Sequence, residues 1–194
     1  MTKITNLQTI AMTVLVVGIF LGTITIADAF AAVDAFLKLD GIPGESTDKR
    51  HEDWIELLSF SHGINQPAST LGSSCGTRSA ERADFSDLSI VKIVDKASPK
   101  LQEARVNGAH IPNVTLELCR PAGDKKVCYF TIRMENAIVT SYQFGGSNTD
   151  NNPTESVSFD YCRAEWTYTT TDQKTGKPTG NFAGTWDKCS PAGT

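Results

Sequence analysis

Alternating apolar and polar residues mark the first predicted strand, in which every second position is apolar: Val33, Ala35, Leu37 and Leu39. Gly41-Ile42-Pro43-Gly44 predicts a turn that ends this strand, and a polar segment follows. Residues 54–61 predict a second strand with apolar side chains on both faces. In a β protein, that pattern predicts core on one face and another subunit or a helix on the other.

Residues 65–83 are small and polar and have no regular period, so they predict a long loop, which in a compact domain is functional or disordered. A strand over residues 84–95 follows, with Leu88, Ile90 and Val94 on one face and Val91 and Ile93 on the other.

One short helix is predicted after this strand. Ser98 can cap it, Pro99 suits the first helical position, and Gly108 can end it. Leu101, Ala104 and the aliphatic stem of Arg105 are expected to face the core.

The rest of the chain reads as β structure, with strands over residues 114–120, 126–134 and 181–188. Between them, apolar residues alternate up to Tyr161 and then shift phase by one at Cys162, which predicts a bulge that bends a sheet. The predicted fold class is mainly β: a small closed β-barrel of two antiparallel sheets with one flanking short α-helix.

An apolar run over residues 11–27 lies near the start of the chain, and two matches to an A-x-A cleavage pattern are found at its end and just after it. This pattern predicts a signal peptide over residues 1–31, cleaved after Ala29 or after Ala31, and a single domain over residues 32–194. The alternative is an uncleaved membrane anchor, because the run is close to the shortest length that spans a bilayer. The expected location is exported, either periplasmic or extracellular.

All five cysteines follow this leader, and an exported chain can keep disulfides. A two-residue turn at 123–124 would place Cys119 opposite Cys128, within bridging distance. A hairpin centred on 175–176 would place Cys162 opposite Cys189. The alternative is four small buried residues on strands. Cys75 is left over, as a free thiol or an intermolecular partner.

Composition and charge do not indicate nucleic acid, a metal ion or a cofactor as a partner. The net charge of −4 and the absence of a Lys/Arg cluster give no reason to expect nucleic-acid binding. The three histidines lack the spacing of a zinc protease, so neither metal nor cofactor is expected; His51 is expected to hydrogen-bond within its loop.

Enzyme activity is not expected either. Ser74 lies in a G-x-S-x-G match, but a nucleophile elbow needs a strand before the serine and a helix after it. Trp166 and Tyr168 share a strand face, which fits a carbohydrate-binding surface or, more commonly, a core or subunit interface.

Three blocks of sequence, in order, carry a resemblance to a known family: AVDAFLKLDGIPGESTDKRHEDWIELLSFSHG, FSDLSIVKIVDKASPKL and ESVSFDYCRAEWTY. Together they resemble the haemolysin-coregulated protein family, the tube proteins of type VI secretion. The resemblance implies a barrel of two sheets with one flanking helix. It also implies six-membered rings that stack into a hollow tube with effector cargo in its lumen.

The resemblance further implies that the long loop contacts the neighbouring ring. The residues expected in this ring-stacking loop are Asn65, Gln66, Leu71, Gly72, Cys75, Gly76, Arg78 and Arg82. A second contact surface is expected at the first turn, from Gly41, Ile42, Pro43, Gly44, Glu45 and Lys49. Cys75 on the stacking loop could covalently lock neighbouring subunits.

The leader and the cysteine pairs depart from the pattern of this family, whose members act from the cytoplasm without a cleavable leader. Both departures agree with export before folding and with an extracellular tube or fibre, without stable membrane insertion once the leader is cleaved. The alternative function is a secreted monomeric or small-oligomeric binding module or effector with the same barrel.

Overall fold

The computed structural model describes residues 33–66, 68–69, 79–80, 83–122, 125–148, 152–172, 175 and 177–190. The chain divides into two units, Met1–Ala31 and Ala32–Thr194, and every described residue belongs to the second. The predicted leader and its cleavage sites lie outside the described residues, as do Ser74, Cys75 and the other stacking-loop residues Leu71, Gly72, Gly76, Arg78 and Arg82.

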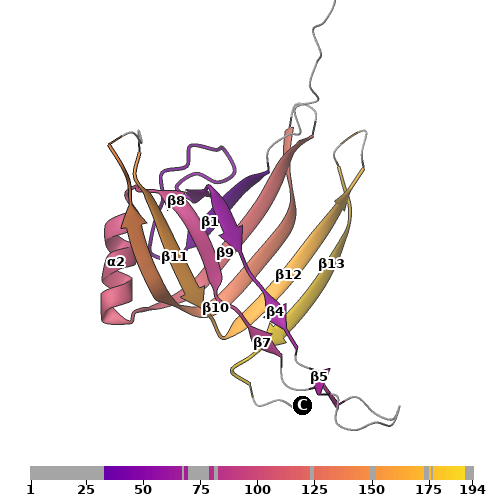
Figure 1. Cartoon of the computed structure of the whole chain (residues 1–194). Coiled ribbons are helices and arrows are strands. Elements are labelled where there is room, and N and C mark those ends of the chain that lie inside the picture. The colour runs from indigo at the N-terminus through magenta and orange to yellow at the C-terminus, as the bar shows by residue number, and fades with distance from the viewer. Residues whose placement is uncertain are drawn as a thin grey trace, which may run out of the picture. The chain divides into compact units, whose positions relative to one another are not determined.

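The described chain is mainly β with one helix, as the sequence predicts (Figure 1). The strands are β1 Asp34–Leu39, β2 Ile55–Leu57, β3 Ser59–Ser61, β4 Ile64–Asn65, β5 Ala68–Ser69, β6 Ser79–Ala80, β7 Asp84–Phe85, β8 Leu88–Ile93, β9 His110–Ala122, β10 Lys125–Gly145, β11 Thr154–Asp160, β12 Arg163–Thr171 and β13 Pro178–Asp187, and the helix is α2 Ser98–Asn107.

The 21-residue strand β10 organises the sheets. It pairs with β9 along its first two thirds, with β12 over Phe130–Glu135 and with β11 over Ile138–Gly145. The strand order β2-β1-β9-β10-β11-β8-β3 results, with β13 beside β12, and every pairing is antiparallel. β9 and β10 are thus common to two antiparallel sheets.

The predicted phase shift near Tyr161 is a break between two strands. Tyr161 and Ala164 are both buried, so the inward positions change from odd to even across the break. Asn136 of β10, beside this break, has a left-handed φ of 53°. Bulges lie within β10 instead, between Cys128 and Phe130 and between Val139 and Ser141.

The prediction of a single strand over residues 54–61 is wrong in one respect, because the chain forms two short strands here and changes its partner strand at Leu58. β2 pairs with β1, β3 pairs with β8, and the Leu58 amide donates to the Val91 carbonyl at 2.8 Å. Ile55 is fully buried, whereas Leu58 is 59% exposed, so the second apolar face is uncovered in the single subunit.

The long loop predicted over residues 65–83 begins and ends as paired strands. β4 pairs with β7, and β5 pairs with β6, so the described parts form a narrow antiparallel ladder that extends from the main sheet (Figure 1).

The helix forms where predicted, with a different first turn. Ala97, not Ser98, is the N-cap residue, because the Ser98 hydroxyl accepts the Asp95 N–H at 3.0 Å instead of capping the helix. Leu101 and Ala104 are buried, but Arg105 is exposed and contributes no stem to the core. Gly108 ends the helix with φ 61°, as expected for a C-terminal glycine.

Apolar side chains from both sheets and α2 form one core between the layers: Ala35, Leu37, Leu39, Ile55, Leu88, Ile90, Leu101, Val114, Leu116, Ile132, Met134, Val139, Val157 and Phe159 among others. The opposite face of β1 carries Asp34, Phe36 and Lys38, and the outer segment, residues 41–54, folds back over it, with His51 on Phe36 and Trp54 beside Lys38. Among the described residues, no helix is long and apolar enough to cross a membrane.

Gly44 anchors this outer segment because its backbone lies against the chain at Trp54. A Cβ at this position would lie 2.3 Å from the Trp54 carbonyl oxygen. We expect Gly44→Ala to lower the free energy of unfolding by roughly 1–3 kcal/mol, the usual cost of overpacking. Urea unfolding measures this cost. Gly145→Ala is the control, since its Cβ meets nothing within 4 Å, and equal stability of the two variants would contradict the prediction.

Candidate functional site

The outer segment, residues 41–54, presents part of the predicted second contact surface. Gly41, Pro43, Glu45 and Lys49 are exposed. Ile42 and Gly44 are buried within the single subunit, since Ile42 packs into the core and Gly44 lies against the Trp54 backbone. Their place in a contact between subunits stays a prediction.

The outer segment also borders an open pocket with acidic and apolar walls. Its lining comes from the outer segment, β2, the residue that follows β2, and the end of β8 with the residues after it: Glu45, Ser46, Glu56, Leu57, Leu58, Ile93, Val94 and Asp95. Carboxylates at the rim with apolar side chains between them suit a cationic side chain with an apolar stem.

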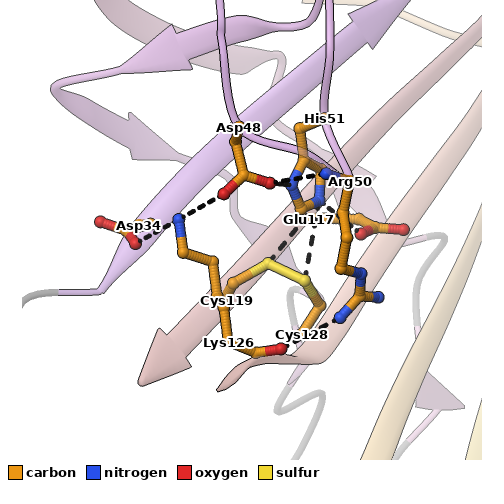
Figure 2. Close-up of a disulfide and its surroundings, with 8 residues drawn as sticks. All are labelled: Asp34, Asp48, Arg50, His51, Glu117, Cys119, Lys126 and Cys128. Carbon is orange, nitrogen blue, oxygen red and sulfur yellow. Dashed lines mark hydrogen bonds and ion pairs between the residues drawn. A yellow bond between two sulfur atoms is a disulfide. The ribbon is translucent and has the colours of Figure 1, made fainter. Parts of the chain in front are cut away.

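A buried histidine fixes the outer segment to the sheet (Figure 2). The His51 ring stacks on Phe36 at a centroid distance of 4.0 Å, and only 1% of His51 is exposed. Its Nδ1 lies 2.7 Å from an Asp48 carboxylate oxygen, and its Nε2 lies 3.0 Å from Glu117 Oε2. The expectation of hydrogen bonding within the loop thus describes Asp48 but omits Glu117 on β9.

Asp48 also binds the sheet through Lys126 of β10, whose Nζ donates at 2.9 Å and also lies 2.9 Å from Asp34. The hydrogen bond from Lys126, together with those from His51 and the Arg50 amide, holds the pKa of the Asp48 carboxyl well below its usual range. Asp48 therefore remains an anionic anchor between the outer segment and the hairpin.

A disulfide joins Cys119 to Cys128 directly beneath His51 (Figure 2). The two residues lie opposite each other in the β9–β10 register, three pairs of residues behind Ala122 and Lys125 at the turn. The turn residues Gly123 and Asp124, on which the predicted register rests, lie outside the described residues.

A second disulfide joins Cys162 to Cys189, although the register predicted for it is wrong. Arg163 pairs with Asp187, and the Lys188 amide donates to the Cys162 carbonyl, so Lys188 and not Cys189 lies opposite Cys162. The reason is the centre of the loop: Thr171 pairs with Pro178, so the hairpin is centred between residues 174 and 175 and not between 175 and 176, and the register shift between Thr170 and Thr171 makes up only part of that difference. Tyr168 accordingly pairs with Phe182 and Trp166 with Gly184.

A buried ion pair fixes α2 to the sheet. Lys92 of β8 pairs with Glu155 of β11 in register, and Lys92 Nζ lies 2.8 Å from Glu155 Oε1 and 2.6 Å from Asp95. The Tyr142 hydroxyl donates to the other Glu155 oxygen and accepts from Gln102 of α2 at 3.1 Å. Burial and the Glu155 carboxylate raise the pKa of Tyr142 to about 12, so it remains a donor.

His62 and Tyr161 meet at the break between β11 and β12, where His62 Nε2 lies 2.5 Å from the Tyr161 hydroxyl. Burial lowers the pKa of His62, and the nearby Lys188 ammonium lowers it further. The unfolded chain therefore binds more protons than the folded chain below about pH 6.5, the ordinary histidine pKa.

We expect the His62 contribution to stability to be complete above that pH and to be lost as the pH falls below it. Urea unfolding from pH 7.5 to 5.5 should show a steeper loss for the native chain than for His62→Gln, which keeps a polar side chain without the titration. Parallel pH profiles for the two proteins would contradict this prediction. His51 and His110 are present in both and serve as an internal control.

Large apolar side chains are exposed on β13 and, in other elements, at Phe144 of β10 and at Leu58 between β2 and β3. Among the described strands β13 pairs with β12 alone, and all ten of its residues are exposed, including Phe182 at 67% and Trp186 at 45%. Phe144 is 69% exposed and Leu58 59%. Exposed apolar side chains in such numbers are typical of a surface that another protein chain covers.

The two aromatic residues noted in the sequence have different environments. Trp166 is half-buried and stacks near Phe85 of β7, with a centroid distance of 6.4 Å, whereas Tyr168 is 43% exposed. Phe85 also stacks near Trp186 at 6.1 Å. These contacts fix the base of the ladder that leads to the predicted stacking loop, of which Asn65 and Gln66 are described and exposed.

Comparisons with known proteins agree on one family. A family model described as "Type VI secretion system effector, Hcp" matches residues 36–168. The chain is 31% identical over 137 residues to Protein hcp1 of Pseudomonas aeruginosa, covering 71% of this chain and 83% of that protein.

Solved structures agree as well. A structure described as a type six secretion system protein has a TM-score of 0.74 at 35% identity, covering 80% of this chain and 96% of the other. Hcp1 from Salmonella typhimurium has a TM-score of 0.65 at 28% identity, covering 80% and 95% respectively.

The fold and these relatives define a structural subunit of the type VI secretion class, one that forms tubes. The chain belongs to the Hcp family.

Proposed function

We propose that the domain over residues 32–194 assembles into rings of six subunits, which stack head to tail into a hollow tube. The observation that carries this proposal is the uncovered apolar surface of a chain in the Hcp family: Leu58, Phe144, Phe182 and Trp186. Ring closure joins two different surfaces of each subunit, and repeated stacking of rings extends the filament. Effector cargo would occupy the lumen.

We also propose that the sheet closes into a barrel. β2 and β3 stand at opposite ends of the strand order, yet they are consecutive in the chain with Leu58 between them. This continuity supports closure through residues 55–61, and a closed sheet leaves fewer exposed strand edges for unspecific association.

Stacking between rings is assigned to residues 65–83 and to Gly41, Pro43, Glu45 and Lys49 of the outer segment. The exposure of these four residues supports the second surface. The acidic pocket beside Glu45 supports a contact with a cationic side chain of the adjacent ring.

We propose that the chain is an exported variant of the family, made with a signal peptide over residues 1–31. The A-x-A matches and the two disulfides support this proposal, since disulfides persist in oxidising compartments. The tube would then form in the periplasm or outside the cell.

Cys75 is proposed to link neighbouring subunits covalently. Assembled protein should run as a ladder of oligomers on a non-reducing denaturing gel and as a monomer after reduction or as Cys75→Ser. A non-reducing gel that contains monomer alone would overturn this proposal.

Light scattering of the chain from Ala32 tests the ring in solution. We expect the mass of six subunits, reduced to one subunit by Phe182→Ser/Trp186→Ser, and unchanged by Val106→Ser, which alters an exposed apolar residue of α2. A monomer for the unaltered chain would instead support the secreted binding module with the same barrel.

A further inference from the structure

Four side chains that can bind a metal ion, the two disulfide cysteines among them, meet at the Cys119–Cys128 bond (Figure 2). They come from three parts of the chain: His51 from the outer segment, Glu117 and Cys119 from β9, and Cys128 from β10. One ligand atom from each lies within 4.8 Å of every other. His51 Nε2 is 3.8 Å from Cys119 Sγ, 3.7 Å from Cys128 Sγ and 3.0 Å from Glu117 Oε2.

These separations are close to those of a tetrahedral zinc site. Zn–S distances of about 2.3 Å and Zn–N or Zn–O distances of about 2.0–2.2 Å put neighbouring ligand atoms roughly 3.3–3.8 Å apart. Nitrogen and sulfur are already at that spacing here. The two sulfurs must separate most, because they are bonded to each other in the disulfide, and His51 Nε2 and Glu117 Oε2, 3.0 Å apart, must separate by a few tenths of an ångström.

The histidine is oriented as a metal ligand before any metal binds. Asp48 accepts from Nδ1 at 2.7 Å, and the stack on Phe36 fixes the plane of the ring, so Nε2 points at Glu117 and the two sulfurs. A carboxylate on the far nitrogen of a ligating histidine is the usual outer-shell arrangement at zinc. Asp48 is itself fixed by Lys126.

We propose that reduction of Cys119–Cys128 converts this cluster into a Zn²⁺ site with His51, Glu117, Cys119 and Cys128 as ligands. A dithiol reductant supplies two electrons and two protons to the S–S bond and becomes a cyclic disulfide itself. Zn²⁺ then displaces one proton from each thiol, and two protons enter solution. No other electrons move, because zinc keeps its charge.

The charges of the site agree with this ligand set. Two thiolates and one carboxylate give three negative charges around a dication, and a neutral imidazole completes the four ligands. One negative charge remains on the site, and among its neighbours the carboxylates of Asp34 and Asp48 are paired with the Lys126 ammonium.

The consequence is that the β9–β10 hairpin and the outer segment can be joined in two ways. The disulfide joins the strands to each other in an oxidising compartment. The metal joins both strands and also residue 51 in a reducing one. The folded chain would therefore keep this end of the domain ordered in either redox state.

The test uses Cys75→Ser chain from Ala32, so that the unpaired thiol cannot bind metal. Oxidised and reduced protein are titrated anaerobically with ZnCl₂ by calorimetry and with CoCl₂ by absorption. We expect one ion per chain in the reduced protein alone. Co²⁺ should give the thiolate charge-transfer band and the intense d–d bands of a four-coordinate ion.

Three variants in this background distinguish the proposed site from unspecific binding. Cys162→Ser/Cys189→Ser, the matched control, removes two other cysteines and should bind as tightly as its parent. Cys119→Ser/Cys128→Ser should lose the thiolate band. Asp48→Asn, which keeps both thiols and can be checked for folding by circular dichroism while oxidised, should bind roughly 10–100-fold more weakly after reduction.

Three results would overturn the proposal: equal zinc binding by oxidised protein, a cobalt spectrum without thiolate bands, or unchanged affinity in Asp48→Asn. Because each measurement is made on the chain in solution, none depends on the formation of rings. Failure of the zinc site and failure of assembly are therefore separate outcomes.

Discussion

Replacing Lys92 by methionine is expected to lower the free energy of unfolding by about 3–5 kcal/mol, because it leaves a buried carboxylate without its cation. Lys92 and Glu155 have fully buried side chains, and their charged atoms lie 2.8 Å apart. Lys92 also donates to Asp95 at 2.6 Å and to the Ile93 carbonyl at 2.8 Å. All three interactions are lost at once.

Urea unfolding of three variants tests this expectation. Lys92→Met/Glu155→Leu should recover most of the loss, since a buried ion pair replaced by apolar groups of similar size is often nearly neutral. Lys96→Met removes the exposed pair with Asp53 and should change stability little. If Lys92→Met were as stable as Lys96→Met, the buried pair would not be what fixes α2 and β11 to β8.

Loss of the Cys162–Cys189 disulfide is expected to have the second large effect. The bond closes a sequence separation of 27 residues, against 9 for Cys119–Cys128. Chain entropy then predicts a loss of about 3.5 kcal/mol for Cys162→Ser/Cys189→Ser, and about 2.5 kcal/mol for Cys119→Ser/Cys128→Ser. The longer loop is the reason for the difference.

Hydrogen exchange shows which part of the chain is destabilised when the Cys162–Cys189 disulfide is lost. Strand β13 has no buried residue and pairs with β12 alone among the described strands, so the disulfide at its end is its main restraint. Amides of β13 should lose protection in Cys162→Ser/Cys189→Ser while those of β9 keep theirs. Unchanged protection in β13 would mean that hydrogen bonds to β12 suffice.

The sequence predicts local structure well where short-range rules decide it. Alternation predicts β1, and Ser-Pro with a later glycine predicts α2 to within its first turn. The turn at 123–124 is short, so counting back from it places Cys119 opposite Cys128. The same counting misplaces Cys162 by one residue, because the longer β12–β13 loop is centred between residues 174 and 175 and not between 175 and 176.

Residues whose role depends on long-range packing could not be found this way. His51 meets Glu117 and Cys128 across 66 and 77 positions of sequence, and no local spacing indicates that cluster. Ile42 and Gly44 look like ordinary turn residues until the outer segment folds over β1. Lys92 did leave a signal, since it follows Leu88 and Ile90 on the inward face and pairs with an inward glutamate.

Electron microscopy of the chain from Ala32, produced under oxidising conditions and stained negatively, tests the central claim most directly. Six-membered rings or stacked tubes are the predicted result. Loss of the tubes, but not of the rings, with reductant would locate a covalent contribution at the stacking contact. Small single particles at high protein concentration would contradict the claim, and the likeness to the Hcp family would then describe the fold alone.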